Sequence, residues 1–223
     1  MSLCVVTGSN RGIGLELTRQ LVERGETVIA ACRHSSPQLD ALGVDVIDGI
    51  DVGDMAAGER LRQHIGQRKI DLLINNAGIL HRDQLGQIDA GVVDNMLAQF
   101  RINSLGPLLV TQALLPCLAD GARVGIVSSR MGSVADNTSG GYYGYRMSKA
   151  AANMVGASLA RDLADRGVAI AVLHPGYVRT EMTGGGGDVD TDTAAAGLLA
   201  RLDELDLSNS GGFWHASGEA LSW

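Results

Sequence analysis

The chain has 223 residues, of which 45% are hydrophobic and 19% are charged, and its formal net charge is −7 at pH 7. This length and balance are typical of one globular domain, and no apolar run approaches the ~20 residues that span a bilayer. The negative charge and the lack of a long basic run argue against nucleic acid or an anionic membrane surface as the main partner.

The chain begins with MSLCVVTGSN, which contains neither a basic stretch nor a small-residue cleavage site, so we expect no secretory signal. Cys4, Cys32 and Cys117 are widely spaced and odd in number, which favours reduced thiols over a disulfide framework or a metal site. We therefore expect a cytoplasmic protein that binds no metal.

Short apolar runs alternate with longer helical patterns along the chain. The expected strands are residues 3–6, 27–31, 44–47, 71–74, 123–128 and 168–173. The expected helices are residues 12–24, 35–42, 54–65, 89–117, 144–166 and 193–205, and the segment 211–223 is expected to add a last strand. This alternation predicts a single α/β domain over residues 1–223, a Rossmann fold whose doubly wound parallel sheet carries helices on both faces.

The segment TGSNRGIG follows the first expected strand and leads into the first expected helix. Gly8, Gly12 and Gly14 let the backbone turn tightly and approach a pyrophosphate, and the helix N-terminus offers free N–H donors. The spacing departs from G-x-G-x-x-G, so a plain strand-to-helix turn is the alternative. We expect Gly8, Ser9, Asn10, Arg11, Gly12, Ile13 and Gly14 to bind a dinucleotide.

The residues after the second expected strand bear on the choice of cofactor. In NAD-selective sites a carboxylate there binds the ribose 2′-hydroxyl, whereas here Cys32, Arg33 and His34 follow the strand. Arg33 together with Arg11 can bind a 2′-phosphate, which favours NADP(H) over NAD(H). The alternative for each arginine is a solvated surface residue. Asp51 and Val52, after the third expected strand, are placed to border an adenine.

The further motifs INNAGIL at 74–80, the serine pair at 128–129, YRMSK at 145–149 and HPGYVRT at 174–180 complete a recognisable set. In order and spacing they resemble the short-chain dehydrogenases/reductases over nearly the whole chain, and in particular the C-factor and Sniffer-like carbonyl reductases. The resemblance implies that Asn76, Ala77, Gly78, Tyr145, Lys149, Pro175, Gly176, Val178 and Thr180 also contact the cofactor, with Lys149 on the nicotinamide ribose.

Tyr145 and Lys149 stand four positions apart on an expected helix, so both side chains lie on one face. A free phenol has a pKa of about 10, and a neighbouring ammonium is needed to stabilise the phenolate near neutral pH. A surface pair with no chemistry is the alternative. Tyr142 and Tyr143 lack a lysine at this spacing and are expected to line the site.

Ser129 follows the fifth expected strand at the edge where open α/β sheets bind ligands, and its hydroxyl is expected to hold the substrate oxygen. The segment between Ser129 and Tyr145 is longer than in many relatives, which leaves Ser128 and Ser133 as alternatives. The resemblance implies that Asn103 organises the active-site lysine, while a kink or a buried amide is its alternative. His174 is expected to be a packed residue rather than a base.

The sequence thus predicts an NADP-dependent oxidoreductase that interconverts a carbonyl and an alcohol of a small molecule. A dinucleotide-binding sensor of the C-factor type is the alternative, and a larger nucleotide-sugar epimerase is disfavoured because Arg11 replaces its middle glycine. We expect substrate specificity to lie in residues 131–143, 81–85 and the glycine-rich loop after Thr180. The apolar faces of residues 101–117 and 146–164 are expected to form a homodimer or homotetramer.

Overall fold

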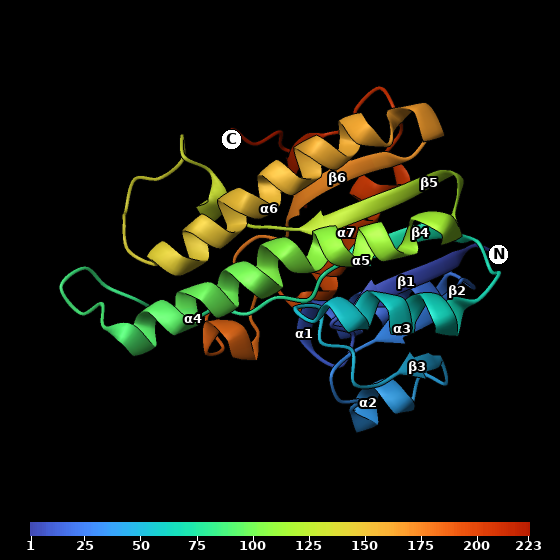
Figure 1. Cartoon of the computed structure of the whole chain (residues 1–223), viewed down its shortest axis with the longest axis horizontal. Coiled ribbons are helices and arrows are strands. Elements are labelled where there is room, and N and C mark those ends of the chain that lie inside the picture. The colour runs from blue at the N-terminus through green and yellow to red at the C-terminus, as the bar shows by residue number, and fades with distance from the viewer.

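The computed structural model describes residues 1–223 and contains one seven-stranded parallel sheet with the order β3-β2-β1-β4-β5-β6-β7 (Figure 1). Its strands are β1 (Leu3–Thr7), β2 (Thr27–Ala31), β3 (Asp45–Ile47), β4 (Ile70–Asn75), β5 (Leu118–Val127), β6 (Ala169–His174) and β7 (Gly212–His215). The order reverses at β1, which pairs with β2 on one side and β4 on the other. Ligands of open α/β sheets bind outside the carboxyl ends of the strands at such a reversal.

Helices cover both faces of the sheet, as the sequence predicted. They are α1 (Gly12–Glu23), α2 (Pro37–Asp40), α3 (Met55–Ile65), α4 (Ala90–Phe100), α5 (Gly106–Leu114), α6 (Tyr143–Asp162) and α7 (Thr191–Asp203). Figure 1 shows α3, α4, α5 and α6 in front of the sheet and α7 behind it. No helix is long and apolar enough to cross a membrane.

The alternation of β1 side chains explains the two layers. Val5 packs in a core cluster with Leu61 of α3 and Ala152 of α6. Cys4 and Val6 point to the other face, where they join the cluster that contains residues of α1 and α7. Successive strand side chains point to opposite faces, so an entirely apolar strand requires helices on both. The Rossmann fold is therefore confirmed.

The expected helix 89–117 is continuous in the structure, although it is not α-helical throughout. A π-helical turn at Arg101–Leu105 separates α4 from α5, and a 3₁₀ turn at Leu115–Cys117 follows α5. Asp89 begins α4 by accepting a hydrogen bond from Val92 N at 2.9 Å, as the expected boundary suggested. A π turn inserts one residue into a helix and is often found at functional sites, and this one contains Asn103.

Candidate active site

A cavity of about 670 Å³ opens at the carboxyl ends of the strands, where the sheet order reverses. This volume lies within the range of small-molecule and cofactor sites. The predicted site residues that line it are Gly8, Asn10, Arg11, Gly12, Ile13, Gly14, Arg33, Val52, Asn76, Ala77, Gly78, Tyr145, Lys149, Pro175 and Thr180. The structure thus brings segments from the whole length of the chain to one site.

The glycine loop has the shape that a pyrophosphate requires. Gly8 has a φ of 70°, and a Cβ on it would lie 2.8 Å from the Cα of Ala77. A Cβ on Gly14 would lie 2.1 Å from the carbonyl oxygen of Gly8, so neither position accepts a side chain. Arg11 precedes α1 without capping it through its side chain, which leaves the first N–H groups of the helix available to an anion. The loop therefore fits a dinucleotide.

Some predicted cofactor residues support the cavity instead of lining it. The Ser9 hydroxyl is fully buried and donates to Val6 O at 2.7 Å. Asp51 accepts a hydrogen bond from Gly53 N at 2.9 Å, and Val178 is 3% exposed. The residues that line the cavity do not include Ser9, Asp51, Val178 or Gly176. Ser9 and Asp51 therefore shape the loops that the other residues present.

The two arginines expected to share a phosphate do not lie together. Arg11 forms an ion pair with Glu181, a cavity residue from the segment after β6 that the sequence analysis missed. Arg33 is exposed, lines the cavity and makes no ion pair. A carboxylate does approach the end of β2, because Asp48 accepts a hydrogen bond from Cys32 Sγ at 3.5 Å, although Asp48 does not line the cavity. Arg33 is thus the free cation on this side of the site.

Tyr145 and Lys149 are buried together on α6, with 7% and 4% of their surfaces exposed. The ammonium of Lys149 lies 5.7 Å from the centroid of the Tyr145 ring and donates to Val127 O at 2.9 Å. The carbonyl at the end of β5 therefore fixes the lysine next to the phenol. The helical spacing predicted from the sequence is confirmed.

The two pKa values are shifted by burial. Burial raises the pKa of the Tyr145 phenol to about 12, while the Ser129 hydroxyl acts in the opposite direction. Burial also lowers the pKa of the Lys149 ammonium to about 8. From the sequence we expected the lysine to dominate and to lower the pKa of the phenol. In the structure desolvation is the larger effect, so the phenol is protonated at neutral pH.

The structure separates the three candidate serines. Ser128 donates its hydroxyl hydrogen to Asn153 Oδ1 at 2.5 Å, and Ser133 donates to Trp223 O at 3.0 Å. Ser129 Oγ accepts a hydrogen bond from Met131 N at 3.2 Å and keeps its own hydrogen for another partner. The Ser129 hydroxyl also lies within hydrogen-bond reach of the Tyr145 phenol, where it lowers the pKa of that group, although Ser128 and not Ser129 lines the cavity.

Asn103 uses its whole side chain to connect the wall of the cavity to α6. Its Oδ1 accepts from Ile79 N at 2.8 Å, while its Nδ2 donates to Ile79 O and to Ser148 Oγ, both at 2.9 Å. Ser148 in turn donates to Tyr145 O at 2.8 Å. Ser148, which the sequence analysis missed, thus links the asparagine to the backbone of the tyrosine.

Residues 2–188 match the model of the short chain dehydrogenase family. The chain belongs to the short-chain dehydrogenase/reductase family. It is 43% identical over 229 residues to 1-hydroxy-2-glutathionyl-2-methyl-3-butene dehydrogenase of Rhodococcus sp. (strain AD45), with complete coverage of both proteins. It is also 45% identical over 157 residues to C-signal of Myxococcus xanthus, covering 69% of this chain and 93% of that protein.

Solved carbonyl reductases of the family have the same architecture. The NADPH-bound carbonyl reductase from chicken fatty liver superimposes with a TM-score of 0.90 at 29% identity, covering 100% of this chain and 99% of that one. The carbonyl reductase Sniffer of D. melanogaster gives 0.89 at 26% identity with the same coverage. The chain is thus an oxidoreductase of this family.

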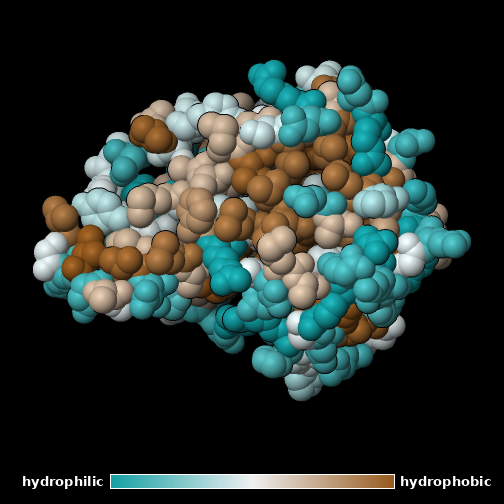
Figure 2. Space-filling model, in the orientation of Figure 1, coloured by the Kyte–Doolittle hydropathy of each residue, from teal (hydrophilic) through white to brown (hydrophobic).

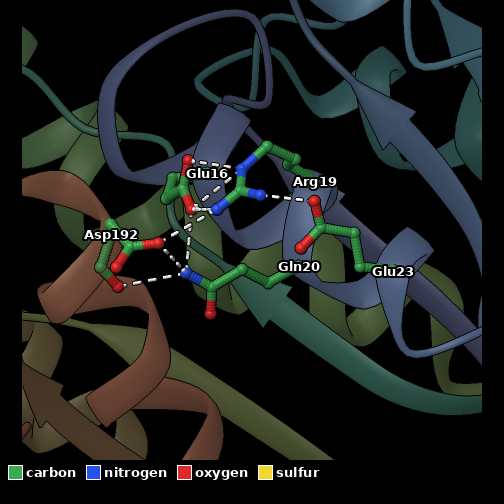
Figure 3. Close-up of polar contacts among 5 residues, drawn as sticks. All are labelled: Glu16, Arg19, Gln20, Glu23 and Asp192. Atoms are coloured by element: carbon green, nitrogen blue, oxygen red, sulfur yellow. Dashed lines mark hydrogen bonds and ion pairs between the residues drawn. The ribbon is translucent and has the colours of Figure 1, made fainter.

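The segment after β6 closes one side of this short-chain dehydrogenase site and is held at both ends. Thr180 begins a 3₁₀ turn at Glu181–Thr183, and Arg179 N donates to Val189 O at 2.9 Å across the glycine-rich loop. At its far end Figure 3 shows Asp192 facing Arg19 and Gln20 of α1. Asp192 Oδ1 accepts from Arg19 at 3.0 Å. The glycine-rich loop after Thr180 therefore carries its own hydrogen bonds.

The adjoining ends of β6 and β7 each carry a histidine. The rings of His174 and His215 lie edge to face with centroids 5.1 Å apart, and His174 Nδ1 is buried without a hydrogen-bond partner. Burial, assisted by His215 and the cations Arg130 and Lys149, lowers the pKa of His174 to about 3. His174 is thus neutral and packed, as expected, and is not a general base at neutral pH.

Proposed function

We propose that this chain is an NADP(H)-dependent oxidoreductase that interconverts a carbonyl and an alcohol, with Tyr145 exchanging the proton. The observation that supports the proposal most is the burial of Tyr145 beside Lys149 in the wall of a cavity that the glycine loop also lines. A sensor requires only the loop, whereas a buried phenol beside a buried ammonium serves proton transfer.

In this proposal the chain's own residues act on the substrate oxygen. A bound nicotinamide supplies hydride to the substrate carbon or accepts it from that carbon. In reduction the Tyr145 hydroxyl donates its proton to the oxygen, and the Lys149 ammonium stabilises the phenolate that remains. In oxidation the phenolate takes the same proton back. The raised pKa of Tyr145 keeps the phenol protonated at neutral pH, which is the form that donates a proton in reduction.

The choice of NADP(H) rests on Arg33. This guanidinium lines the cavity beyond the end of β2 and has no ion-pair partner, so it is available to a 2′-phosphate. The carbonyl reductases from chicken fatty liver and Pseudomonas aeruginosa PAO1, which have the same fold, contain NADPH and NADP respectively. Arg11 is paired with Glu181 and contributes less to this choice.

A second hollow, of about 460 Å³, suggests a class of substrate. It lies between the segments 82–87 and 139–142 and is lined by Arg82, Asp83, Gln84, Gln87, Ser139, Gly140, Gly141 and Tyr142. The substrate named for the Rhodococcus relative carries a glutathionyl group, which presents carboxylates and amides. The guanidinium of Arg82 and the side-chain amides of Gln84 and Gln87 can bind carboxylates and amides. We propose that alcohols with a peptide-like conjugate are among the substrates.

The test is turnover by native protein and by two tyrosine variants. NADPH is offered with aldehydes, ketones and quinones, and NADP⁺ with a secondary alcohol that does or does not carry a glutathionyl group. Tyr145→Phe keeps the ring but loses the proton, so we expect turnover to fall about 10²–10⁴-fold with little change in NADPH affinity. Tyr143→Phe is the matched control and retains turnover, because Tyr143 is 36% exposed and, contrary to expectation, lines neither the cavity nor the second hollow.

The rival function is a dinucleotide-binding sensor, which the resemblance to C-signal of Myxococcus xanthus favours. A sensor binds NADPH but turns over none of the substrates, and its Tyr145→Phe variant behaves like the native protein. Turnover that depends on Tyr145 contradicts the sensor, and its absence across the whole panel contradicts the enzyme.

We also propose that the protein forms homo-oligomers through the exposed apolar side chains of α4 and α6. Leu97 and Met154 are 62% and 67% exposed, which is unusual for large apolar residues on adjacent helices.

A cytoplasmic location remains a prediction, supported by the three free cysteines.

A further inference from the structure

The helix that carries Tyr145 and Lys149 begins without a local cap. Tyr142, the residue before α6, has a φ of 52° and a ψ of 42°, and its side chain makes no capping hydrogen bond. It is the only residue other than glycine with a positive φ. The first N–H groups of a helix need acceptors, and Tyr145 lies within this first turn. Loss of the turn would therefore displace the phenol.

The missing cap comes from a residue 60 positions earlier in the chain. Tyr143 N donates to Asp83 Oδ1 at 2.5 Å, and Gly144 N donates to Asp83 Oδ2 at 2.9 Å. Tyr142 N also donates to the backbone oxygen of Asp83 at 3.3 Å. Both carboxylate oxygens thus accept hydrogen bonds from the first turn of α6. The helix dipole also stabilises a negative charge at this end of the helix.

The segment that carries Asp83 is itself fixed to the wall of the cavity. The side chain of Asn103 accepts a hydrogen bond from the N–H of Ile79 and donates one to its carbonyl oxygen. His81 N donates to Gln99 Oε1 at 2.9 Å. Asn103 and Gln99 are buried, with 1% and 0% of their surfaces exposed. The segment that carries the carboxylate is therefore anchored to the cavity wall by buried side chains of α4 and of the π turn.

We propose that Asp83 is a positioning residue for the reaction, which holds the first turn of α6, and with it the Tyr145 hydroxyl, in register with Ser129 and the cavity. The inference rests on the proposed function, because it assigns Asp83 to the same proton transfer. Asp83 acts through Tyr145 and touches no reacting atom. It also joins the two segments that border the second hollow.

The experiment compares Asp83→Ala and Asp83→Asn with a control, Asp54→Ala. Asp54 caps α3 locally by accepting from Ala56 N at 3.0 Å, so its loss removes a cap far from α6. For Asp83→Ala we expect kcat to fall about tenfold to a hundredfold, since small displacements of a catalytic group have effects of this size, while the KM for NADPH stays within about twofold. Asparagine keeps one acceptor, so Asp83→Asn is expected to recover part of the lost kcat. Asp54→Ala leaves kcat unchanged.

A kcat for Asp83→Ala equal to that of the native protein overturns the proposal, and so does an equal loss of kcat in Asp54→Ala. If Asp83→Ala does not fold, Asp83→Asn decides, because a kcat equal to the native value again contradicts the role. Amide hydrogen exchange over residues 142–146 gives a readout without substrate, and faster exchange in Asp83→Asn is expected. If the native protein shows no turnover, the proposed function is contradicted. The hydrogen exchange still tests whether Asp83 caps α6 in that case.

Discussion

Arg33 and Arg11 were equivalent candidates for the 2′-phosphate in the sequence, and their surroundings distinguish them. The Glu181 carboxylate pairs with Arg11, whereas nothing in the chain pairs with Arg33. We expect Arg33→Ala to raise the KM for NADPH roughly ten- to a hundredfold, the size of one lost charged hydrogen bond, and to leave the KM for NADH unchanged. Initial rates with both cofactors check this. Arg161→Ala, an exposed arginine outside the cavity, is the control, and an equal effect on both cofactors would contradict the assignment.

His174 makes the stability of the fold depend on pH. Its pKa is about 3 in the folded chain and 6.5 in the unfolded chain, so between these values the unfolded chain binds more protons. Stability therefore falls as the pH is lowered from 6.5 towards 3, by on the order of a few kcal/mol from this group. Urea unfolding from pH 7 to pH 4 measures the slope. His174→Gln is expected to flatten it, whereas the exposed His34→Gln is not, and equal slopes in all three proteins would exclude His174 as the cause.

The residues that the sequence placed correctly are those whose role depends on local spacing. Tyr145 and Lys149 lie four positions apart, and helix geometry alone brings them to one face. The direction of the phenol pKa was predicted wrongly, because burial depends on what the rest of the chain packs around the ring. Asp83 was missed for a related reason, since its partners lie 60 residues away.

At the scale of elements, the 3₁₀ turn after Ser129 packs directly on α6. A Cβ on Gly132 would lie 2.6 Å from the carbonyl carbon of Lys149, and backbone atoms cannot move aside cheaply. We expect Gly132→Ala to push this turn from the helix, reducing stability by about 1–3 kcal/mol and kcat by about tenfold or more. Thermal unfolding and initial rates measure both effects.

Gly91→Ala is the matched control for this substitution. Gly91 lies within α4, and its added Cβ would meet only Asp89 Oδ1, at an ordinary distance of 3.5 Å. Alanine is therefore expected to stabilise α4 by roughly 0.5–1 kcal/mol without affecting turnover. If Gly132→Ala behaved in the same way, the turn and the helix would not be in rigid contact.

The elements themselves were largely predictable. Apolar strands and amphipathic helices alternate in the sequence, and this is sufficient for the strand set and the two helical layers. The π turn within residues 89–117 was not predictable, because such a turn adds one residue to a helix and leaves the apolar pattern almost unchanged. The side chain of Asn103 in this turn is held by tertiary hydrogen bonds to Ile79 and Ser148.

At the scale of the whole molecule, apolar side chains gather on the face formed by α4, α5 and α6 (Figure 2). Leu97, Phe100, Met147 and Met154 are 62%, 41%, 55% and 67% exposed on α4 and α6. If this face is an interface, the native protein sediments as a dimer or tetramer, and Leu97→Glu combined with Met154→Glu yields a monomer. Leu207→Glu, at a 53% exposed leucine beyond α7, is the control that leaves the mass unchanged. A native monomer at all concentrations would contradict the prediction.

The chain contains two lysines, Lys69 on the surface and Lys149 in the cavity. Burial lowers the pKa of the Lys149 amine to about 8, so near this pH more of it is unprotonated, and hence nucleophilic, than of an ordinary lysine. Mild acylation of the intact protein can therefore report on this amine by peptide mass, with Lys69 as the internal reference. Protection of Lys149 by an added compound would then identify molecules that enter the cavity, without any need to know the reaction that follows.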